Sequence, residues 1–89
     1  MQSVIKLETK SAQLSPTETL PVLRYGSYGD AVKIVQRLLF TLNYYSNVIN
    51  GVYGLRTEAA VKSFQKDNGL VVNGIVDSKT WLGLSRISC

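Results

Sequence analysis

The chain has 89 residues, a formal net charge of +4, no histidine and one cysteine. That length suffices for one domain with a modest core, and 45% hydrophobic residues are typical of a folded rather than a disordered protein. A zinc site of the usual His/Cys type, a Ser-His-Asp triad and an internal disulfide are excluded, because the sequence lacks the residues that would form them.

Residues 1–21 are predicted to form a flexible arm or linker, and residues 22–87 the folded domain. The leading segment is rich in Ser, Thr, Gln and Lys and shows no sustained hydrophobic period, and Pro16 and Pro21 punctuate it as in linkers. The chain as given starts without the basic and then apolar pattern of a secretion signal. No apolar run approaches the roughly 20 residues of a membrane span. The positive charge excess lies after residue 21 and mildly favours anionic partners.

A first helix is predicted from Tyr28 to Leu42. Apolar residues recur along one face at steps of three and four: Val32, Val35, Leu39 and Leu42. Ser27 and Asp30 have the spacing of a capping box, in which each side chain bonds the backbone amide of the other. Asn43 tolerates the left-handed conformation that ends many helices.

Two further helices are predicted. The second carries an apolar stripe and stops at Asn68-Gly69, and the third is shorter, from Ser78 to Leu84. The expected fold class is therefore all-α, a small three-helix bundle. Its expected core consists of Val32, Leu39, Leu42, Val61, Phe64, Ile75, Trp81 and Leu84.

A nine-residue segment occurs twice, at residues 49–57 and 72–80, and seven of the nine positions match in kind. In each copy, Asn-Gly predicts a tight turn through positive φ, and the next two apolar residues are expected to plug into the core. Gly54 and Asp77 are expected to cap the following helices. A Thr at the third helical position is expected to bond back toward each cap.

This arrangement resembles the type 1 peptidoglycan-binding domain family over about residues 23–85. The family pattern has a Gly-x-x-Gly entry, a first helix with Val, Gln and Leu, two Asp-Gly turns, and helices carrying Thr, Ala-Val, Phe-Gln and Thr-Trp. The matching positions here are Gly26, Gly29, Val32, Gln36, Leu39, Leu42-Asn43-Tyr44, Asn50-Gly51-Val52-Tyr53-Gly54, Thr57, Ala60-Val61, Phe64-Gln65, Gly69-Leu70, Asn73-Gly74-Ile75-Val76, Thr80-Trp81 and Leu84. Asn replaces the commoner Asp before both turn glycines, which weakens any ligand contact that the family makes through those carboxylates.

The resemblance implies a non-catalytic module that binds the glycan or the stem peptide of bacterial peptidoglycan. Such a module targets or anchors a partner or fused enzyme, for example a cell-wall hydrolase, in the cell envelope (periplasm or cell wall). The resemblance implies no catalytic residue, cofactor or metal.

Two other functions are left open by the sequence. One is a protein-interaction or prodomain-like module on the same fold, although Cys89 lacks the short motif by which such prodomains ligate zinc, and we interpret it as an inert terminal residue. The other is nucleic-acid binding, which a basic three-helix domain can achieve. We expect no nucleic-acid partner, because the third helix offers only Lys79 among its early polar positions.

The predicted ligand-binding residues are Tyr25, Tyr28, Tyr45, Tyr53 and Arg56. A tyrosine offers a ring face to a sugar and a hydroxyl to its polar edge, and an arginine suits a stem-peptide carboxylate. The expected site is a shallow groove formed by the first helix, the loop after it and the start of the second helix. A Tyr45→Ala plus Arg56→Ala variant is expected to lose wall binding and keep its fold.

Gln36 and Gln65 occupy equivalent places within the apolar stripes of the first two helices. We expect both side chains to hydrogen-bond the turn backbones rather than a ligand, because buried polar groups need partners within the protein.

Overall fold

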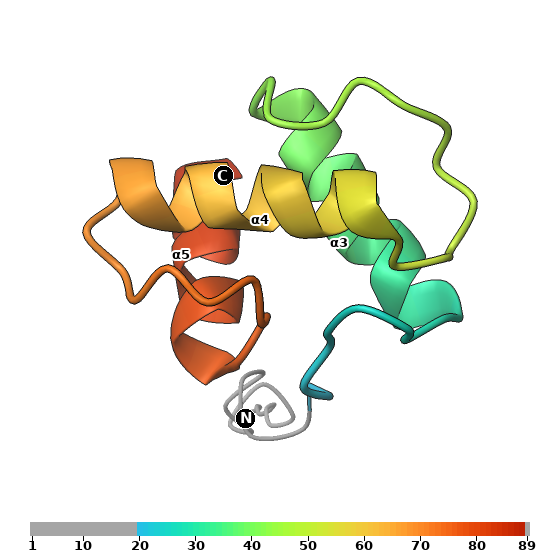
Figure 1. Ribbon diagram of the computed structural model, residues 1–89. Coiled ribbons are helices and arrows are strands. Elements are labelled where there is room, and N and C mark those ends of the chain that lie inside the picture. Colours follow the sequence, from blue (N-terminus) through green and yellow to red (C-terminus); the bar gives the residue numbers. More distant parts are fainter. Residues whose placement is uncertain (1–19, 89) are drawn as a thin grey trace, which may run out of the picture.

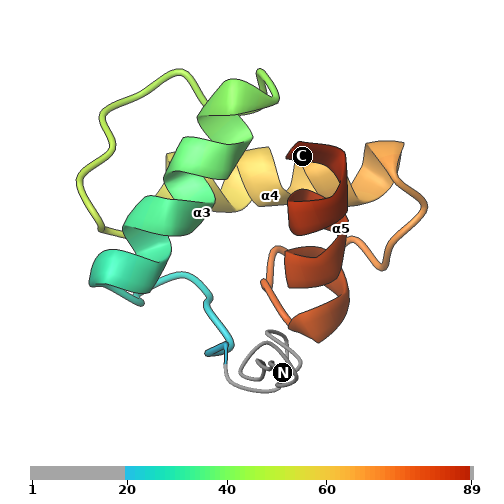
Figure 2. The same ribbon diagram turned by 180° about the vertical axis from the view of Figure 1, so that it is seen from behind.

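The computed structural model describes residues 20–88, and these residues form three α-helices. They are α3 (Asp30–Thr41), α4 (Leu55–Asp67) and α5 (Ser78–Ser88). Figure 1 shows α4 lying across α3 and α5, and the view from behind in Figure 2 shows α3 and α5 on the opposite side of α4. Within residues 20–88 the only β pairing consists of two isolated bridges. The predicted all-α three-helix fold is confirmed. The predicted arm falls almost entirely outside the described residues, as does Cys89.

The start of α3 differs from the prediction. Its first residue is Asp30, and its N-cap is Gly29, which makes no side-chain capping bond. The Ser27 hydroxyl instead accepts the amide of Arg24, at 3.1 Å from nitrogen to oxygen, so the predicted capping box is wrong. The physical reason is that Tyr28 is extended in a bridge with Val52 and cannot be helical at the same time.

The ends of the helices follow local sequence signals. Asn43, with φ 69°, follows the C-cap of α3, and Gly69, with φ 70°, follows the C-cap of α4, as predicted. The third helix runs to Ser88, beyond the predicted end at Leu84. No glycine or proline follows Leu84 before the chain end, so no local signal stops the helix there.

Residues 23–29 form a strap, with a turn at Tyr25-Gly26, that pairs with both Asn-Gly turns. The Leu23 amide and carbonyl exchange hydrogen bonds with Val76, at 3.1 and 2.8 Å. Farther along the strap, the Gly29 amide donates to the Gly51 carbonyl at 2.9 Å, and the Tyr53 amide donates to the Ser27 carbonyl at 2.9 Å. The entry strap therefore holds the two copies of the repeat side by side.

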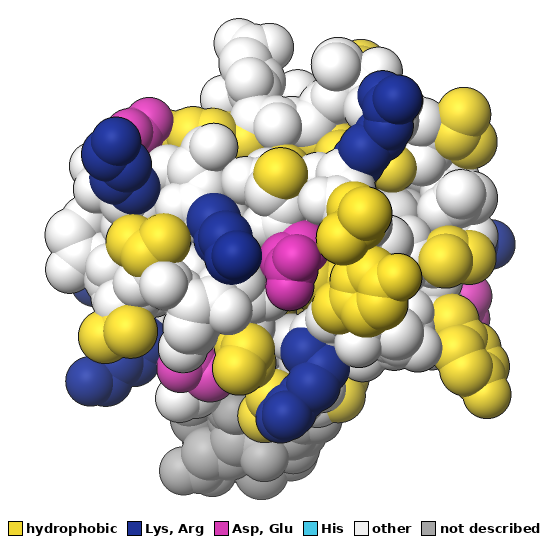
Figure 3. All heavy atoms as spheres, in the orientation of Figure 1, with side chains coloured by type: hydrophobic (Ala, Val, Ile, Leu, Met, Phe, Trp, Pro, Cys, Tyr) yellow, Lys and Arg dark blue, Asp and Glu magenta, His cyan; other side chains and the backbone are white. Residues whose placement is uncertain are grey.

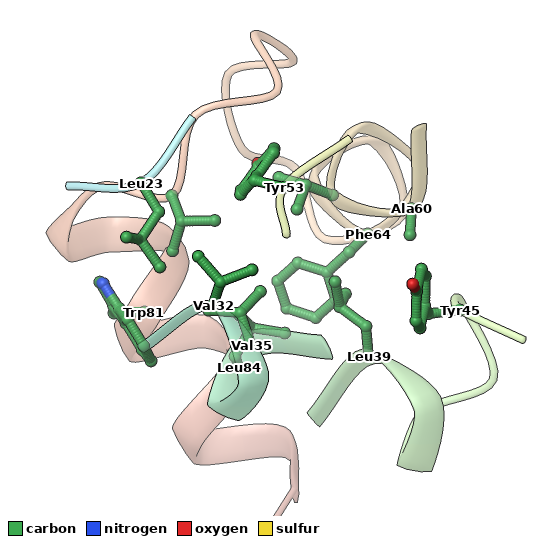
Figure 4. Packing of buried hydrophobic residues seen from close by; sticks show 12 residues of the cluster. Leu23, Val32, Val35, Leu39, Tyr45, Tyr53, Ala60, Phe64, Trp81 and Leu84 are labelled. Atoms are coloured by element: carbon green, nitrogen blue, oxygen red, sulfur yellow. The ribbon is translucent and has the colours of Figure 1, made fainter. Parts of the chain in front are cut away.

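The hydrophobic core lies between the three helices. In Figure 4 the Phe64 ring occupies the centre of the cluster, with Trp81 at one end and Tyr45 at the other. The buried hydrophobic residues are Leu23, Val32, Val35, Leu39, Tyr45, Tyr53, Ala60, Val61, Phe64, Val76, Trp81 and Leu84. Leu42 and Ile75, both expected in the core, are half-buried.

In each turn, the second of the two apolar residues after Asn-Gly is the one that enters the core. Tyr53 and Val76 are buried, whereas Val52 is exposed and Ile75 is half-buried. The expectation that both members of each pair plug into the core is therefore wrong. Successive residues of an extended segment point to opposite sides, so only one of two neighbours can face inward.

The folded domain includes the first residues that the structure describes. Leu20 packs against the core, and the Trp81 indole nitrogen donates to the Pro21 carbonyl oxygen at 2.8 Å. The start of the described segment is thereby fixed to the first turn of α5.

The Tyr53 hydroxyl connects the two copies of the repeat through the core. It donates to the Gly74 carbonyl oxygen at 2.6 Å, and the side chain is 1% exposed. Burial raises the pKa of the Tyr53 hydroxyl above its ordinary value, and the nearby Glu58 carboxylate raises it further.

We expect the unfolding free energy to fall as the pH rises above about 10, where tyrosine ionises in the unfolded chain. The folded state keeps the Tyr53 proton, so its stabilising effect is complete below that pH and is lost above it. The slope should approach about 1.4 kcal/mol per pH unit for this proton. Urea titrations between pH 8 and 11 measure it. The Tyr53→Phe variant should show a shallower decline, and an equally steep decline in that variant would contradict the assignment to Tyr53.

Candidate functional site

The buried side chain of Gln36 organises the first turn. Its Oε1 accepts the Gly51 amide at 2.9 Å, and its Nε2 lies 3.0 Å from both the Val52 carbonyl oxygen and the Thr57 hydroxyl oxygen. The Asn50 Oδ1 accepts the Val52 amide at 3.0 Å. Both hydrogens and the oxygen of the Gln36 amide are thereby used, as a buried amide requires.

Gln65 repeats this arrangement at the second turn. Its Oε1 accepts the amides of Asn73 and Gly74 at 3.1 and 3.0 Å. Its Nε2 donates to the Ile75 carbonyl at 2.9 Å and to the Thr80 hydroxyl at 3.1 Å. The prediction that both glutamines bond the turn backbones is confirmed, and the two turn glycines have nearly equal φ, 77° and 73°.

The hydrogen bonding of the two threonine hydroxyls differs from the expectation. The hydroxyls of Thr57 and Thr80 accept bonds from the buried glutamines, and within residues 20–88 neither bonds back to a helix cap. The cap of α5 is instead completed by Asp77, whose Oδ1 accepts the Thr80 amide at 3.1 Å. Gly54 caps α4 at the equivalent position without a side chain.

A cavity of about 420 Å³ opens beside the first turn, and we call it the α4 cavity. It lies between the loop that follows α3 and the first turn of α4. Its lining residues are Tyr45, Asn47, Val48, Asn50, Val52, Gly54, Leu55, Arg56 and Thr57. Arg56 is the one charged side chain among them.

The α4 cavity combines hydrogen-bond donors with exposed apolar side chains. Arg56 Nη1 donates to the Asn47 Oδ1 at 2.9 Å, which fixes the guanidinium beside the cavity. The side-chain nitrogens of Asn47 and Asn50 have no hydrogen-bond acceptor among residues 20–88, so they remain available as donors. Val48, 71% exposed, provides apolar surface next to them. Such a site suits a ligand rich in carbonyl or carboxylate oxygens with some apolar groups.

Apolar side chains also surround the cavity. Figure 3 shows hydrophobic side chains gathered over the start of α4 and the neighbouring loop, with few acidic side chains among them. The exposed ones on the lining or next to it include Tyr28, Val48, Val52 and Leu55. Exposed apolar side chains that gather in one place mark interaction surfaces more often than scattered ones do.

The five predicted ligand residues do not all reach this cavity. Tyr45 and Arg56 line it. Tyr28 lies opposite Val52 in a bridge whose hydrogen bonds flank the pair, so their side chains are close on one face, and Tyr28 is 83% exposed. Tyr25 is exposed but lies outside the cavity lining. Tyr53 is buried under the turn and presents no surface to a ligand.

Tyr45 is largely a structural residue. It is 6% exposed, and its hydroxyl donates to the Val48 carbonyl oxygen at 2.6 Å. Its ring belongs to the core cluster, so Tyr45→Ala would remove core volume as well as cavity wall. We therefore expect Tyr45→Ala to lower the stability of the fold as well as any wall binding.

Several cavity residues were not predicted from the sequence. Asn47 and Val48 come from a loop without hydrophobic periodicity, and nothing in that segment indicates which side chains face the cavity. Asn50 was assigned to the turn alone. The repeat contains a signal for this site, because in both copies a basic residue follows the asparagine of the turn after six positions.

No helix within residues 20–88 has the length and apolar character needed to cross a bilayer. The same residues contain no cluster of three or more Cys, Asp or Glu side chains suited to a metal ion.

Comparison with known proteins identifies a family model described as "Putative peptidoglycan binding domain", which matches residues 28–82. The N-acetylmuramoyl-L-alanine amidase CwlM of Mycobacterium tuberculosis is 36% identical over 61 residues, which cover 68% of this chain and 15% of the amidase. The spore cortex-lytic enzyme of Bacillus subtilis is 43% identical over 60 residues, which cover 66% of this chain and 20% of the enzyme. The chain thus spans a fifth or less of these two enzymes.

Among solved structures, the crystal structure of the SleB N-terminal domain superposes with a TM-score of 0.78 at 30% sequence identity. The match covers 80% of this chain and 97% of that domain. The three-helix architecture is therefore shared across the whole of a solved domain.

Proposed function

Because the chain belongs to the peptidoglycan-binding domain family, we propose that it binds peptidoglycan as a non-catalytic module through the α4 cavity. The observation that carries the choice of site is the cluster of donors at the cavity, formed by Arg56, Asn47 and Asn50 beside the exposed Val48 and Val52.

The chemistry of peptidoglycan complements this cluster. The polymer consists of N-acetylated sugars that carry short peptides, so it presents amide carbonyls, carboxylates and methyl groups. A guanidinium pairs with a carboxylate through two parallel hydrogen bonds, and the two asparagine amides suit carbonyl oxygens. Val48 and Val52 suit the methyl groups of acetyl and alanyl units.

Tyr28 extends the surface next to the α4 cavity. Its ring is exposed and stands beside Val52 at the rim. A tyrosine fixed by backbone pairing on both sides offers a flat apolar face to a sugar ring at low entropic cost. We assign Tyr28 to this supporting role and leave Tyr25 and Tyr53 out of the binding site.

The cavity lining supports binding rather than catalysis. Glycoside hydrolysis ordinarily uses two carboxyl groups on either side of the scissile bond, and the residues that line the α4 cavity include no carboxylate. We further propose that the domain acts in the cell envelope by holding a hydrolase or another enzyme against the wall, as the names of the amidase and cortex-lytic relatives suggest.

The Arg56→Gln substitution tests the proposed site. We expect it to weaken co-sedimentation with insoluble bacterial peptidoglycan by about tenfold, the loss of about 1.4 kcal/mol that a charged hydrogen bond supplies. Arg56 is exposed, so the melting temperature should stay within a few degrees of the original.

Arg37→Gln is the matched control, because it removes the same charge from an exposed position on α3 that does not line the cavity. Binding by this control should stay close to that of the original protein. If the original protein does not sediment with peptidoglycan at high concentration, the proposed function is wrong. If both variants bind equally well, the proposed site is wrong.

A further inference from the structure

We propose that the second copy of the repeat forms a second recognition site for the same polymer, at the first turn of α5. The inference rests on the proposed function of the α4 cavity. Its basis is another cavity, of about 210 Å³, which we call the α5 cavity. The residues that line it occupy the same places in the second repeat as the α4 cavity residues do in the first.

A shift of 23 residues, the spacing between Asn50 and Asn73, relates the two linings. It converts Asn50 to Asn73 and Arg56 to Lys79, which both line the α5 cavity. The remaining equivalent pairs in the two linings are Asn47 with Leu70, Val48 with Val71, Gly54 with Asp77, Leu55 with Ser78 and Thr57 with Thr80.

Two donors of the α5 cavity, Asn73 and Lys79, occupy the places of Asn50 and Arg56 in the first cavity. Asn73 Oδ1 accepts the Ile75 amide at 2.9 Å and lies 3.1 Å from Gln65 Nε2. Its side-chain nitrogen has no acceptor among the residues that the structure describes, and it is free to donate outward. Lys79 supplies a positive charge where the first copy has an arginine, and Val71 is 74% exposed where the first copy has Val48.

The second site continues along α5. An adjoining cavity of about 510 Å³ shares Leu70 and Lys79 with the α5 cavity and extends to Leu82 and Arg86. Lys79 and Arg86 are seven residues apart, so they lie on one face of α5, two turns from each other. A groove with a cation at each end and a leucine between them suits an extended peptide that carries carboxylates.

Three differences make the second site the weaker one. Leu70 stands where the first copy has the donor Asn47. An ammonium lacks the forked geometry with which a guanidinium holds a carboxylate. Asp77 adds a negative charge and a hydrogen-bond acceptor where the first copy has Gly54. The α5 cavity should therefore favour the part of the stem peptide that offers an N–H group together with a carboxylate.

The two sites lie near opposite ends of α4. The α4 cavity includes the first turn of this helix, and the α5 cavity begins in the loop just beyond its last turn. One strand of a repeating polymer that reaches from one cavity to the other would engage both sites, and the second contact would then strengthen overall binding through high effective concentration.

The experiment is a chemical-shift titration of the 15N-labelled protein with soluble disaccharide-peptide fragments released from peptidoglycan. We expect two groups of backbone amides to shift, around residues 47–57 and around residues 70–80, with a higher dissociation constant for the second group. Lys79→Gln should remove the second group of shifts and leave the first. It should weaken binding to insoluble peptidoglycan by about threefold to fivefold, the range of an exposed charge pair.

Lys66→Gln is the control of equal charge, because Lys66 is exposed on α4 and lines neither cavity. It should leave both groups of shifts in place. Shifts confined to residues 47–57 would overturn the second site while the proposed function stands. Equal shifts around residues 70–80 with and without Lys79 would also overturn it. A protein that shows no shifts and does not sediment with peptidoglycan would overturn the proposed function and the second site together.

Discussion

Replacing Gln65 by alanine is expected to lower the unfolding free energy by about 3–5 kcal/mol, with a similar loss for Gln36→Ala. The Gln65 amide satisfies the buried Gly74 amide and the buried Thr80 hydroxyl, and its removal leaves both without partners and opens a void. A domain of this size has about 5–15 kcal/mol of stability in total, so either variant should be close to unfolding at body temperature. Urea and thermal denaturation measure the loss.

Lys66→Ala is the control in the same helix, since Lys66 is exposed and such substitutions usually change stability by about 0.5 kcal/mol or less. Gln65→Glu keeps the volume of the side chain and changes its hydrogen-bonding groups, so it separates these two contributions to stability. Glutamate keeps an acceptor for Gly74 but places a carboxylate against the Ile75 carbonyl, so it should destabilise the fold at neutral pH. Protonation restores a donor, and the stability of Gln65→Glu relative to the original protein should therefore rise as the pH falls. A Gln65→Ala variant as stable as Lys66→Ala would contradict the role of the glutamine.

Substitution of the turn glycines by alanine should show a graded loss of stability. Gly51, Gly69 and Gly74 have nearly the same positive φ, 77°, 70° and 73°, so each alanine variant incurs a similar backbone cost of about 1–2 kcal/mol. The added Cβ would meet nothing within 4 Å at Gly69, but at Gly51 it would lie 3.1 Å from the Gly29 carbonyl oxygen. We expect Gly51→Ala to lose about 2–4 kcal/mol and Gly69→Ala about 1 kcal/mol.

Gly74→Ala should fall between these two. Its Cβ would lie 2.9 Å from the Glu58 Cγ and 3.0 Å from the Lys62 Cε, and both belong to flexible side chains that can move away. At Gly51 the obstacle is backbone held by the hydrogen bond from the Gly29 amide to the Gly51 carbonyl, so relief requires the strap to shift. Equal losses at Gly51 and Gly69 would show that close packing of the strap contributes nothing to the turn.

Much of the fold could be predicted from the repeat, because the same short-range signals for a turn and a helix start occur in both copies. An Asn-Gly turn, a buried apolar residue and a helix N-cap depend on only a few neighbouring residues. A glutamine within an apolar stripe needs polar partners nearby. These features gave the turns, the glutamine bonds and the start of α5. The capping box at Ser27 failed because long-range pairing of Tyr28 with Val52 overrode a local signal.

The candidate site was less predictable than the fold. The composition of the sequence drew attention to exposed aromatic residues, but Tyr45 and Tyr53 serve the core because their rings fill volume between helices. The asparagines and valines of the α4 cavity come from loop and turn positions. The direction in which their side chains point depends on the path of the loop across the domain. Only Arg56, placed one residue into α4 by the repeat, could be located beside the cavity from local rules.

The phenol of Tyr53 spans from the first turn to the backbone of the second. The second copy of the repeat is not complete alone, because a carbonyl oxygen of its turn accepts a hydrogen bond from a side chain of the first copy. Loosening at Gly51 would thus withdraw support from Gly74, and amide protons in both loops should exchange with solvent through a single shared opening event. The two copies of the repeat thus behave as one cooperative unit, in which the second turn depends on a side chain of the first.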